Sequence, residues 1–536
     1  MTALVVTSKR SICSFCGIAR QRYVISLNKR QKRFKSTQLK QLKQDVEWQP
    51  VIGLEVHAQI LADGKLFSGA SSKYGAPVNS QVSFLDSALP GTLPVLNRRC
   101  VEAGVLTALA LKCRINKVSR FDRKHYFYAD LPAGYQITQQ NHAIANDGAF
   151  RYIEYGEREE DCVEKSARIL QLQLEQDSGK SLHDDLEARS LIDLNRAGIA
   201  LMEIVTAPDF HTGNEARSFV RELRLLLVTL GTCNGRFSEG SIRVDANISV
   251  HRPGEPLGTR SEVKNINSIN CLKKAIDFEI ERQIEVLERG DEVVNETRSF
   301  DKDTGKTVPM RDKESKQDYR FMPEPNLPPL HLHSLCDVSP GSCSGVIIDN
   351  VEKKLPALPN EIRDYLMNKY GLNLYRANFI VNGEIVDVYE KLVATRDINK
   401  FTSFLINHFL NVILEHDSTF SESGISPESV GDLYDWYINE DLSLLNVQKI
   451  IRGLLDGESK DPKYLADMWN VWQINDDEYL TDVCKKIIQE NPSQVAKIKK
   501  GKKRAINKLM GEARTLTSDR GNLTKMSEIF KKLIQD

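Results

Sequence analysis

Alternation of apolar and polar residues is the pattern that most limits how this chain can fold. In the stretch VIGLEVHAQI, residues 51–60, every second side chain is apolar, whereas Glu55 and His57 lie at positions in between. Because successive side chains of a strand point to opposite faces, the stretch predicts a strand with one core face and one polar face. The polar face is either an ordinary wet surface or one wall of a site that holds a cation or a phosphate.

The same period of two recurs in four later segments. They are LQLQLEQD (170–177), LIDLNRAG (191–198), RVDANISV (243–250) and SEVKN (261–265). Such strands dominate the N-terminal part of the chain and predict a largely antiparallel sheet with one polar face. That face carries mainly carboxylates, amides and a histidine, which are the ligands of a magnesium-type ion. Amphipathic sheets are common, so the pattern alone leaves a solvated face open.

Helical signals complete an α+β pattern. One helix is expected from about Asn214 to Gly231, and another should follow the N-cap candidates Asn267 and Ser268 and end at Gly290. From about residue 346 the apolar spacing becomes helical, as in FTSFLINHFLNVILEH (401–416). We therefore expect a sheet-based domain over residues 46–345, a helical domain over 346–425 and a small helical tail domain over 426–536.

The N-terminus has the composition of a targeting segment. The first 44 residues contain eleven Lys and Arg and no acid before Asp45. This predicts a presequence over residues 1–45 and import into the mitochondrial matrix, with a basic nucleic-acid-binding arm as the alternative. The rest of the chain has 62 basic and 73 acidic residues, so any RNA contact must depend on local patches. No apolar run approaches the roughly 20 residues of a membrane span.

Six motifs occur in the order found in one known family. They are GLEVHAQI (53–60), DRKHYFYADLPAGYQIT (122–138), DLNRAGIALMEIVTAPD (193–209), EGSIRVDANISV (239–250), EVKNINS (262–268) and DYRFMPEPNLPPL (318–330). Together they resemble the B subunit of the tRNA-dependent aspartyl/glutamyl-tRNA amidotransferases over most of residues 50–536. The chain has Gln176 where many members have an acid, which leaves open whether Glu175 or its neighbour matches the family's ligand.

The resemblance implies a catalytic cradle domain, here residues 46–345, and a tail domain that binds tRNA. It implies phosphorylation of Glu-tRNA(Gln) with ATP and Mg²⁺ as cofactors, followed by transamidation to Gln-tRNA(Gln). Its implied partners are the A-type amidase (glutaminase) subunit that supplies ammonia, a third small subunit (C or a lineage-specific replacement) and tRNA(Gln) charged with glutamate. The alternatives are a non-catalytic RNA-binding assembly protein that retains the fold, and a metal-dependent ligase or kinase that acts on a small molecule.

Candidate site residues come from the polar strand faces together with the resemblance. The candidate catalytic residues are Glu55, His57, Glu175 and Lys264. The candidate metal ligands are His57, Glu55, Glu175, Glu203 and Glu262. The candidate cofactor-binding residues are Asp193, Asn195, Asp245, Asn247 and Asn265. Ion pairing of Lys264 with Glu262 and hydrogen bonding within the sheet are the alternatives for these groups.

Basic residues interleaved with aromatic ones predict contacts with RNA. Rings stack on the bases of a single-stranded end while cations meet its phosphates. The candidates near the catalytic motifs are Arg123, Lys124, Tyr126, Tyr128 and Tyr135, and those in the tail are Lys499, Lys500, Lys502, Lys503 and Arg504. The alternatives are a core hairpin for the first group and a solvated helix face for the second.

Overall fold

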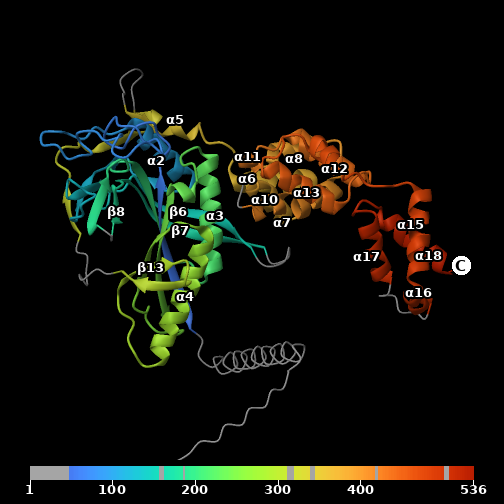
Figure 1. The fold of residues 1–536 in the computed structure, drawn as a ribbon. Coiled ribbons are helices and arrows are strands. Elements are labelled where there is room, and N and C mark those ends of the chain that lie inside the picture. Colours follow the sequence, from blue (N-terminus) through green and yellow to red (C-terminus); the bar gives the residue numbers. More distant parts are fainter. Residues whose placement is uncertain are drawn as a thin grey trace, which may run out of the picture. The chain divides into compact units, whose positions relative to one another are not determined.

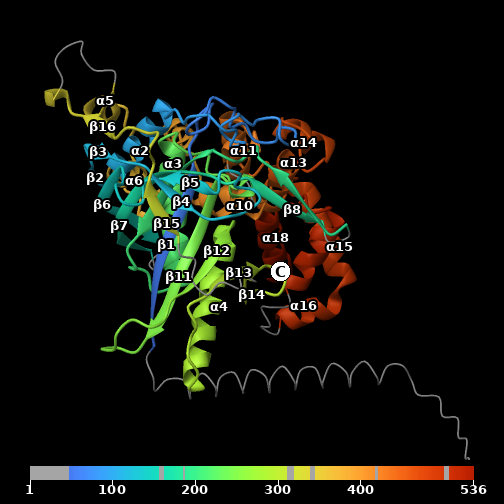
Figure 2. The same cartoon turned by 90° about the vertical axis from the view of Figure 1, so that its left-hand side faces the viewer.

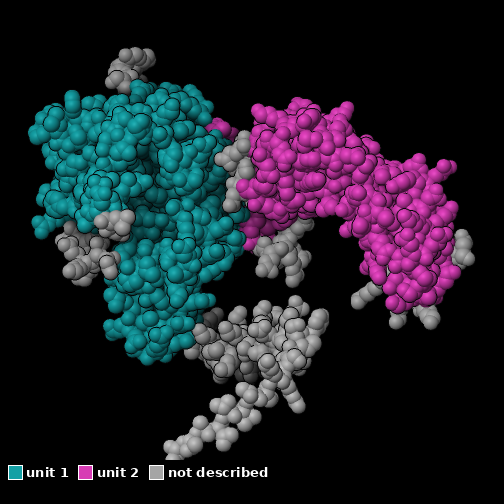
Figure 3. All heavy atoms as spheres, viewed as in Figure 1, with its two compact units in different colours: residues 1–154, 165–354 teal, residues 155–164, 355–536 magenta. Residues whose placement is uncertain are grey.

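The computed structural model describes residues 48–155, 162–184, 187–310, 319–337, 345–416, 420–499 and 506–535. Figure 3 colours two compact units, residues 1–154 with 165–354 and residues 155–164 with 355–536. The predicted presequence, residues 1–45, lies outside the described residues, and the predicted domain boundaries at 345 and 425 stay predictions. Among the described helices, none combines the length and the hydropathy needed to cross a lipid bilayer.

A large, mostly antiparallel sheet is the framework of the first unit (Figure 1). Within the described residues its order is β14-β13-β12-β11-β1-β10-β7-β6-β2. The central strand β1 pairs antiparallel with β10 and β11, whereas β12 and β13 pair in parallel. The strands are β1 (Gln49–Gln59), β2 (Arg114–Ile115), β6 (Ala145–Glu154), β7 (Val163–Gln176), β10 (Ala200–Thr206), β11 (Ile242–His251), β12 (Ser261–Ile266), β13 (Thr297–Asp301) and β14 (Lys306–Pro309). The predicted α+β class with a largely antiparallel sheet is confirmed.

Smaller sheets border the large one. They are β15 (Arg320–Pro323) with β4 (Asp122–His125) and β5 (Tyr135–Thr138), then β17 (Val346–Ile347) with β16 (Leu330–His333) and β3 (Val118–Ser119), and the hairpin of β8 (Lys180–Asp184) and β9 (Arg189–Asp193). The backbone N–H of Ile137 in β5 donates to Oε1 of Gln176 in β7 at 3.0 Å. This contact holds the sheet of β4 and β5 against the end of β7.

Helices cover the apolar face of the large sheet. Figure 2 shows α3 (Gly213–Thr229) and α4 (Ile269–Glu288) beside the long strands. Phe219 of α3 packs against Phe210 and against Tyr152 of β6, with ring centroids 5.0 and 5.7 Å apart. Gln283 of α4 donates to the backbone carbonyl of Ile248 in β11 at 3.0 Å. Both predicted helices are confirmed, and α2 (Arg98–Ala110) and α5 (Ile348–Glu352) complete the α-helices described in this unit.

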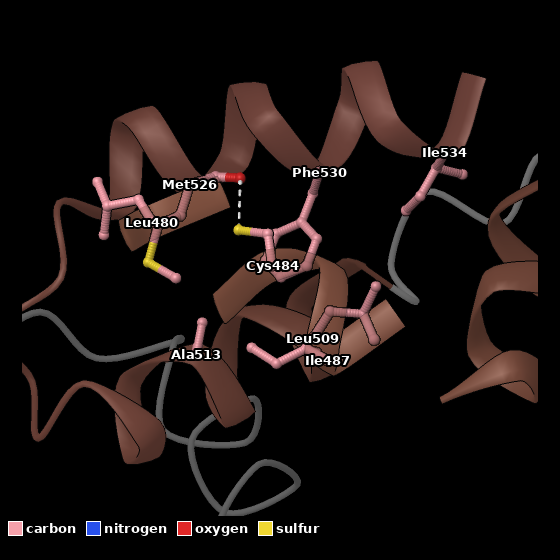
Figure 4. Packing of buried hydrophobic residues seen from close by; sticks show 8 residues of the cluster. All are labelled: Leu480, Cys484, Ile487, Leu509, Ala513, Met526, Phe530 and Ile534. Carbon is pink, nitrogen blue, oxygen red and sulfur yellow. Dashed lines mark hydrogen bonds between the residues drawn. The ribbon is translucent and has the colours of Figure 1, made fainter. Parts of the chain in front are cut away.

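From residue 355 onward the described residues of the second unit are mainly helical. Its elements are α6 (Pro359–Tyr370), α7 (Leu374–Asn382), α8 (Val386–Val393), α9 (Ile398–Phe404), the π-helical η5 (Leu405–Leu410), α10 (Asn411–Glu415), α11 (Phe420–Ser423), α12 (Pro427–Ile438), α13 (Leu444–Leu455), α14 (Pro462–Met468), α15 (Asp477–Glu490), α16 (Pro492–Lys499), α17 (Ile506–Leu516) and α18 (Leu523–Gln535). Figure 4 shows the core of the last helices, where Leu480, Cys484 and Ile487 line one face of α15. Phe530 and Met526 of α18 close this core.

Candidate functional site

The polar face of the large sheet is richest in ionisable groups along its central strand, β1. Antiparallel pairing places His57 opposite Glu203 of β10 and Glu55 opposite Asp245 of β11. Because directly opposed residues of a ladder point to the same side of the sheet, these four side chains share one face. The strand register therefore brings together groups that lie far apart in the sequence.

The first group, which we call the histidine cluster, consists of His57, Glu175 and Glu203. One potential ligand atom from each residue lies within 4.8 Å of the others. His57 Nε2 is 3.7 Å from Glu203 Oε2, and the side-chain amide of Gln173 donates to the same oxygen at 2.7 Å. Oε2 of Glu175 is buried and accepts no hydrogen bond, although Lys124 Nζ lies 3.6 Å away. A buried acceptor without a donor is costly, so this oxygen is suited to bind a cation.

The second group, the carboxylate cluster, consists of Glu55, Asp245 and Glu262. Their ligand atoms also lie within 4.8 Å of one another. The side-chain amide of Asn247 donates to Glu55 Oε1 at 2.9 Å, while its own Oδ1 is buried and accepts no hydrogen bond. The backbone N–H of Asn265 donates to Asp245 Oδ1 at 2.8 Å. One buried acceptor oxygen without a donor therefore lies at each cluster.

Positive side chains surround both clusters. Lys264 Nζ lies 3.5 Å from Glu262 Oε2, and Arg243 donates to Asp177 Oδ2 at 2.8 Å. Burial, together with the charges of Arg243, Lys124 and Lys264, lowers the pKa of His57 well below its usual range. The imidazole is therefore neutral at physiological pH, which is the form that binds a metal ion.

The carboxyl groups respond to burial in the opposite direction. Burial and the neighbouring Glu175 raise the pKa of Glu203, and burial followed by Glu262 raises the pKa of Glu55. Burial raises the pKa of Asp245 to about 6. Placing several acids together on a half-buried face makes it costly to ionise them. A bound cation would remove this cost because it favours the ionised forms.

The donor sets fit divalent cations. The histidine cluster offers a neutral imidazole and two carboxylates, and the carboxylate cluster offers three carboxylates beside the amide oxygen of Asn247. Mg²⁺ prefers such oxygen ligands and commonly binds substrate phosphates through its remaining positions, whereas an added imidazole also suits Mn²⁺ or Zn²⁺. The predicted metal ligands are thus divided between two neighbouring clusters, and Asp245, predicted to bind the cofactor, lies with the second.

Glu175 and Gln176 point to opposite sides of β7. Glu175 reaches the histidine cluster, whereas the side chain of Gln176 accepts the backbone N–H of Ile137. Of the two positions left open by the sequence, the structure therefore places Glu175 at the potential metal site.

Lys124 lies at the histidine cluster, which the sequence reasoning did not foresee. Burial alone would lower its pKa, but Glu175 and Glu203 more than offset this and raise it. Its ammonium lies 5.2 Å from the ring centroid of Tyr319, and that ring packs against Tyr126 with centroids 5.7 Å apart. The signal that was missing is the packing of β4 over the polar face, which no local pattern reveals.

Asp193 and Asn195 are not brought to either cluster. Oδ1 of Asp193 accepts the backbone N–H of Asn79 at 3.2 Å, and Oδ1 of Asn195 accepts that of Gln81 at 2.8 Å. The side-chain amide of Asn195 also donates to the carbonyl of Pro77 at 2.6 Å. Both side chains fasten the segment between β1 and α2, and their predicted contact with a cofactor stays a prediction.

The other predicted RNA contacts are spread over the chain. Arg123 makes a two-point ion pair with Glu324, at 2.6 and 3.1 Å, and lies 4.3 Å from the ring centroid of Tyr135. Tyr128 is 49% exposed, and Lys499 is exposed at the end of α16. Lys500, Lys502, Lys503 and Arg504 lie outside the described residues. Contact of these groups with RNA stays a prediction.

Comparison with known proteins relates the chain to a family. The family described as the GatB/GatE catalytic domain matches residues 50–336, and that described as the GatB domain matches residues 387–534. The chain is 47% identical over 502 residues to the B subunit of the human mitochondrial glutamyl-tRNA(Gln) amidotransferase, a match that covers 92% of this chain and 90% of the relative. The Danio rerio protein of the same name is also 47% identical, over 93% of this chain and 91% of the relative. The B subunit of the Rickettsia typhi aspartyl/glutamyl-tRNA(Asn/Gln) amidotransferase is 42% identical, over 90% and 97%.

Proposed function

The chain belongs to the family of glutamyl-tRNA(Gln) amidotransferase B subunits, which are parts of a ligase, and from this premise we propose that its polar sheet face activates and amidates a glutamate attached to tRNA(Gln). The observation that carries the proposal is the meeting of the histidine and carboxylate clusters along β1. An acidic face of this kind, bordered by Lys124, Lys264 and Arg243, suits phosphate chemistry with divalent ions better than it suits a simple RNA-binding surface.

Amidation needs a prior phosphorylation because a carboxylate is a poor electrophile. In the proposed reaction, an oxygen of the glutamyl side-chain carboxylate attacks the γ-phosphorus of ATP, and ADP leaves. The nitrogen of ammonia then attacks the carbonyl carbon of the acyl phosphate, phosphate leaves with the bonding electrons, and the nitrogen loses a proton to a base. Phosphoryl transfer depends mainly on positioning and on neutralisation of negative charge.

The residues of the two clusters have distinct tasks in this proposal. His57, Glu175 and Glu203 would hold one Mg²⁺, and Glu55, Asp245 and Glu262 another. When bound, these ions neutralise charge on the phosphate oxygens. Gln173 orients Glu203 through its 2.7 Å hydrogen bond.

The neighbouring cations contribute fixed positive charge. Lys264 lies 3.5 Å from Glu262, a distance that leaves its donors available to a phosphate oxygen. Arg243 is held by Asp177, so its charge stays close to the face. Lys124, whose Nζ lies 3.6 Å from Glu175, would contact the glutamyl carboxylate or the transferred phosphoryl group at the histidine cluster.

RNA and partners complete the proposed reaction. The exposed rings of Phe127 and Tyr128 can stack on the acceptor end of the tRNA, and the tail helices near Lys499 can bind its phosphates. We assign catalysis to residues 46–345 and tRNA binding to the helical tail, residues 426–536. Ammonia would come from a partner amidase, with a third small subunit in the complex, and the basic N-terminus together with the mitochondrial relatives supports action in the mitochondrial matrix.

ATP consumption by the assembled complex tests the proposal. ADP release is measured with glutamylated tRNA(Gln), with correctly charged tRNA(Glu) and without RNA. We expect stimulation by glutamylated tRNA(Gln) and loss of that stimulation in Glu175→Gln. Glu164→Gln, an exposed position at the other end of β7, is the matched control and should behave like the unsubstituted chain.

The rival functions give different results in the same assay. A non-catalytic assembly protein consumes no ATP under any condition, and a small-molecule ligase or kinase turns over without RNA. Either result contradicts the proposal.

A further inference from the structure

A row of polar side chains crosses three neighbouring strands and ends at the histidine cluster. In the order β1-β10-β7, His57 lies opposite Glu203, and Glu203 lies opposite Gln173. Gln171 precedes Gln173 by two residues in β7, so its side chain points to the same face of the sheet. Two glutamines therefore lie next to the carboxylate that the proposed function assigns to a metal ion.

The side chain of Gln173 is held by three polar partners. The residue is 1% exposed, and its amide nitrogen donates to Glu203 Oε2 at 2.7 Å and to Thr138 Oγ1 at 3.2 Å. Its amide oxygen accepts a hydrogen bond from the side-chain amide of Gln171. Because a buried amide group without a partner is costly, these contacts together favour one orientation of Gln173.

Gln171 decides which end of the Gln173 amide faces Glu203. The side-chain nitrogen of Gln171 lies 3.1 Å from the backbone carbonyl oxygen of Gln140 and 3.5 Å from that of Gln139. A backbone carbonyl can only accept, so the nitrogen of Gln171, and not its oxygen, must lie on this side. Its second N–H is available to Gln173, which presents its oxygen to Gln171 and its nitrogen to Glu203.

The backbone carbonyls that set this polarity are themselves fixed. Gln139 is fully buried, its Oε1 accepts the backbone N–H of Leu174 at 3.1 Å, and its Nε2 donates to Ser119 Oγ at 3.0 Å. The segment that carries these carbonyls directly follows β5 and is thereby held on β7. A flipped amide at Gln173 would bring its oxygen against the carboxylate of Glu203 and break the hydrogen bond from Gln171.

We propose that Gln171 is a positioning residue for the histidine cluster and that it acts on Glu203 through Gln173. We call these two glutamines the amide relay. The inference rests on the proposed function, because it takes from that function the binding of a metal ion by His57, Glu175 and Glu203. The amide relay keeps an N–H on one oxygen of Glu203 and so fixes the rotation of the carboxylate toward the ion. Removal of such a hydrogen-bond partner of a metal ligand typically lowers metal affinity about tenfold to a hundredfold.

Mn²⁺ binding to the assembled complex, measured by calorimetry without RNA or ATP, tests the amide relay. Gln173→Leu should weaken binding at one of the two proposed sites about tenfold to a hundredfold. Gln171→Leu should weaken it about twofold to tenfold, the effect of losing one neutral hydrogen bond. Gln140→Leu is the matched control, because its side chain is exposed and the substitution keeps the backbone carbonyl that Gln171 contacts. Unchanged affinity in both relay variants overturns the proposal.

A charged variant separates the amide relay from simple electrostatics. Gln171→Glu adds a negative charge near the cluster, which by charge alone should tighten Mn²⁺ binding. The amide relay predicts the opposite, because a carboxylate at this position has no N–H for Gln173 and draws the Gln173 nitrogen away from Glu203. We therefore expect weaker binding than in the unsubstituted chain, whereas Gln140→Glu, the control for added charge, should not weaken it. Binding that is equal or tighter in Gln171→Glu overturns the proposal.

A double-mutant cycle with His57→Ala assigns the effect to the histidine cluster. In that background the remaining Mn²⁺ affinity reports the carboxylate cluster, so Gln171→Leu should change it no further. An equal effect of Gln171→Leu in both backgrounds would mean that the substitution loosens the sheet as a whole, and it would overturn the proposal. Gln171 is only partly buried, so its variants keep the test decisive where Gln173→Leu does not fold.

Amidation distinguishes failure of the amide relay from failure of the proposed function. With glutamylated tRNA(Gln) and ATP, the relay variants should need more Mg²⁺ for the half-maximal rate and should regain the rate of the unsubstituted chain at saturating Mg²⁺. An unsubstituted chain that binds Mn²⁺ but consumes no ATP would count against the proposed function alone, since calorimetry needs no turnover. A slow rate that saturating Mg²⁺ does not restore, together with unchanged Mn²⁺ affinity, overturns the amide relay.

Discussion

Substitution of Asn265 separates the role of its backbone from that of its side chain. Asn265 lies in β12 with φ of 57°, in the left-handed region that glycine, asparagine and aspartate tolerate best. The register of β11 against β12 shifts here, because three steps along β12 from Val263 to Ile266 match two steps along β11 from Ala246 to Val244. This bulge directs the N–H of Asn265 to Asp245, while its own side chain is exposed.

The expected size of the effect on activity follows from these contacts. Asn265→Gly preserves the left-handed backbone and the hydrogen bond, so its activity should stay within about twofold. Asn265→Val places a β-branched residue where the left-handed conformation costs roughly 1–2 kcal/mol or more. Relaxation to an extended backbone forfeits a hydrogen bond to a carboxylate, worth about 1.5–3 kcal/mol. If the whole of this free energy is lost from the transition state because Asp245 is misplaced, phosphoryl transfer slows about tenfold to a hundredfold.

The assay is single-turnover amidation of preformed Glu-tRNA(Gln), with ammonium chloride as the nitrogen donor and thermal unfolding followed in parallel. Asn265→Asp is the control, because aspartate also tolerates the left-handed region. Equal rates for the glycine and valine variants would refute the argument. A glycine variant as slow as the valine variant would show that the side chain carries the effect, as the sequence-based prediction of cofactor contact by Asn265 requires.

Three further outcomes are expected. His57→Ala should slow single-turnover amidation on the order of a thousandfold and leave tRNA affinity, measured by filter binding, unchanged; a near-normal rate would make His57 part of an ordinary wet surface. Because burial raises the pKa of Asp245 to about 6, protons compete with a metal ion below that pH. The Mn²⁺ affinity of the carboxylate cluster, measured by calorimetry, should therefore fall about tenfold per pH unit below about pH 6 and change little above it. An affinity that rises toward acid contradicts that assignment. Phe530→Ala should cost the tail core about 3–5 kcal/mol in denaturant unfolding, whereas Leu516→Ala, at a position 44% exposed, should change little, and equal effects would mean that Phe530 packs loosely.

The fold followed from local patterns because strands such as β1 alternate between buried and less buried residues. Ile52 and Val56 are fully buried, as period two predicts, and Glu55 and His57 lie on the other face. The helix expected from about Asn214 was recognisable from its apolar spacing, and the one after Ser268 from its N-cap candidates. These features depend on near neighbours in the chain, which is the information that a sequence pattern contains.

The division of the site into two clusters could not be predicted in this way. It depends on which strands pair and in which register, so Asp245 joins Glu55, whereas Asp193, with a similar pattern, fastens a loop. Lys124 illustrates the same limit, since its neighbours in sequence indicated RNA while its neighbours in space are Glu175 and Tyr319. Long-range pairing sets these contacts, and no local periodicity encodes it.

The central position of β1 also ties activity to the completion of folding. Its partners in the sheet are β10 and β11, so each cluster requires strands separated by much of the first unit of the chain. Pairing of such high contact order forms slowly, because long loops must close before the contacts are made. A nascent or partly folded chain therefore lacks both of the proposed ion sites, and we expect it to consume no ATP. A slip of one residue in the pairing of β1 would turn Glu55 and His57 toward the core. Only the sheet with every strand in register brings the residues of the two proposed ion sites together, so misfolded chains should be inactive.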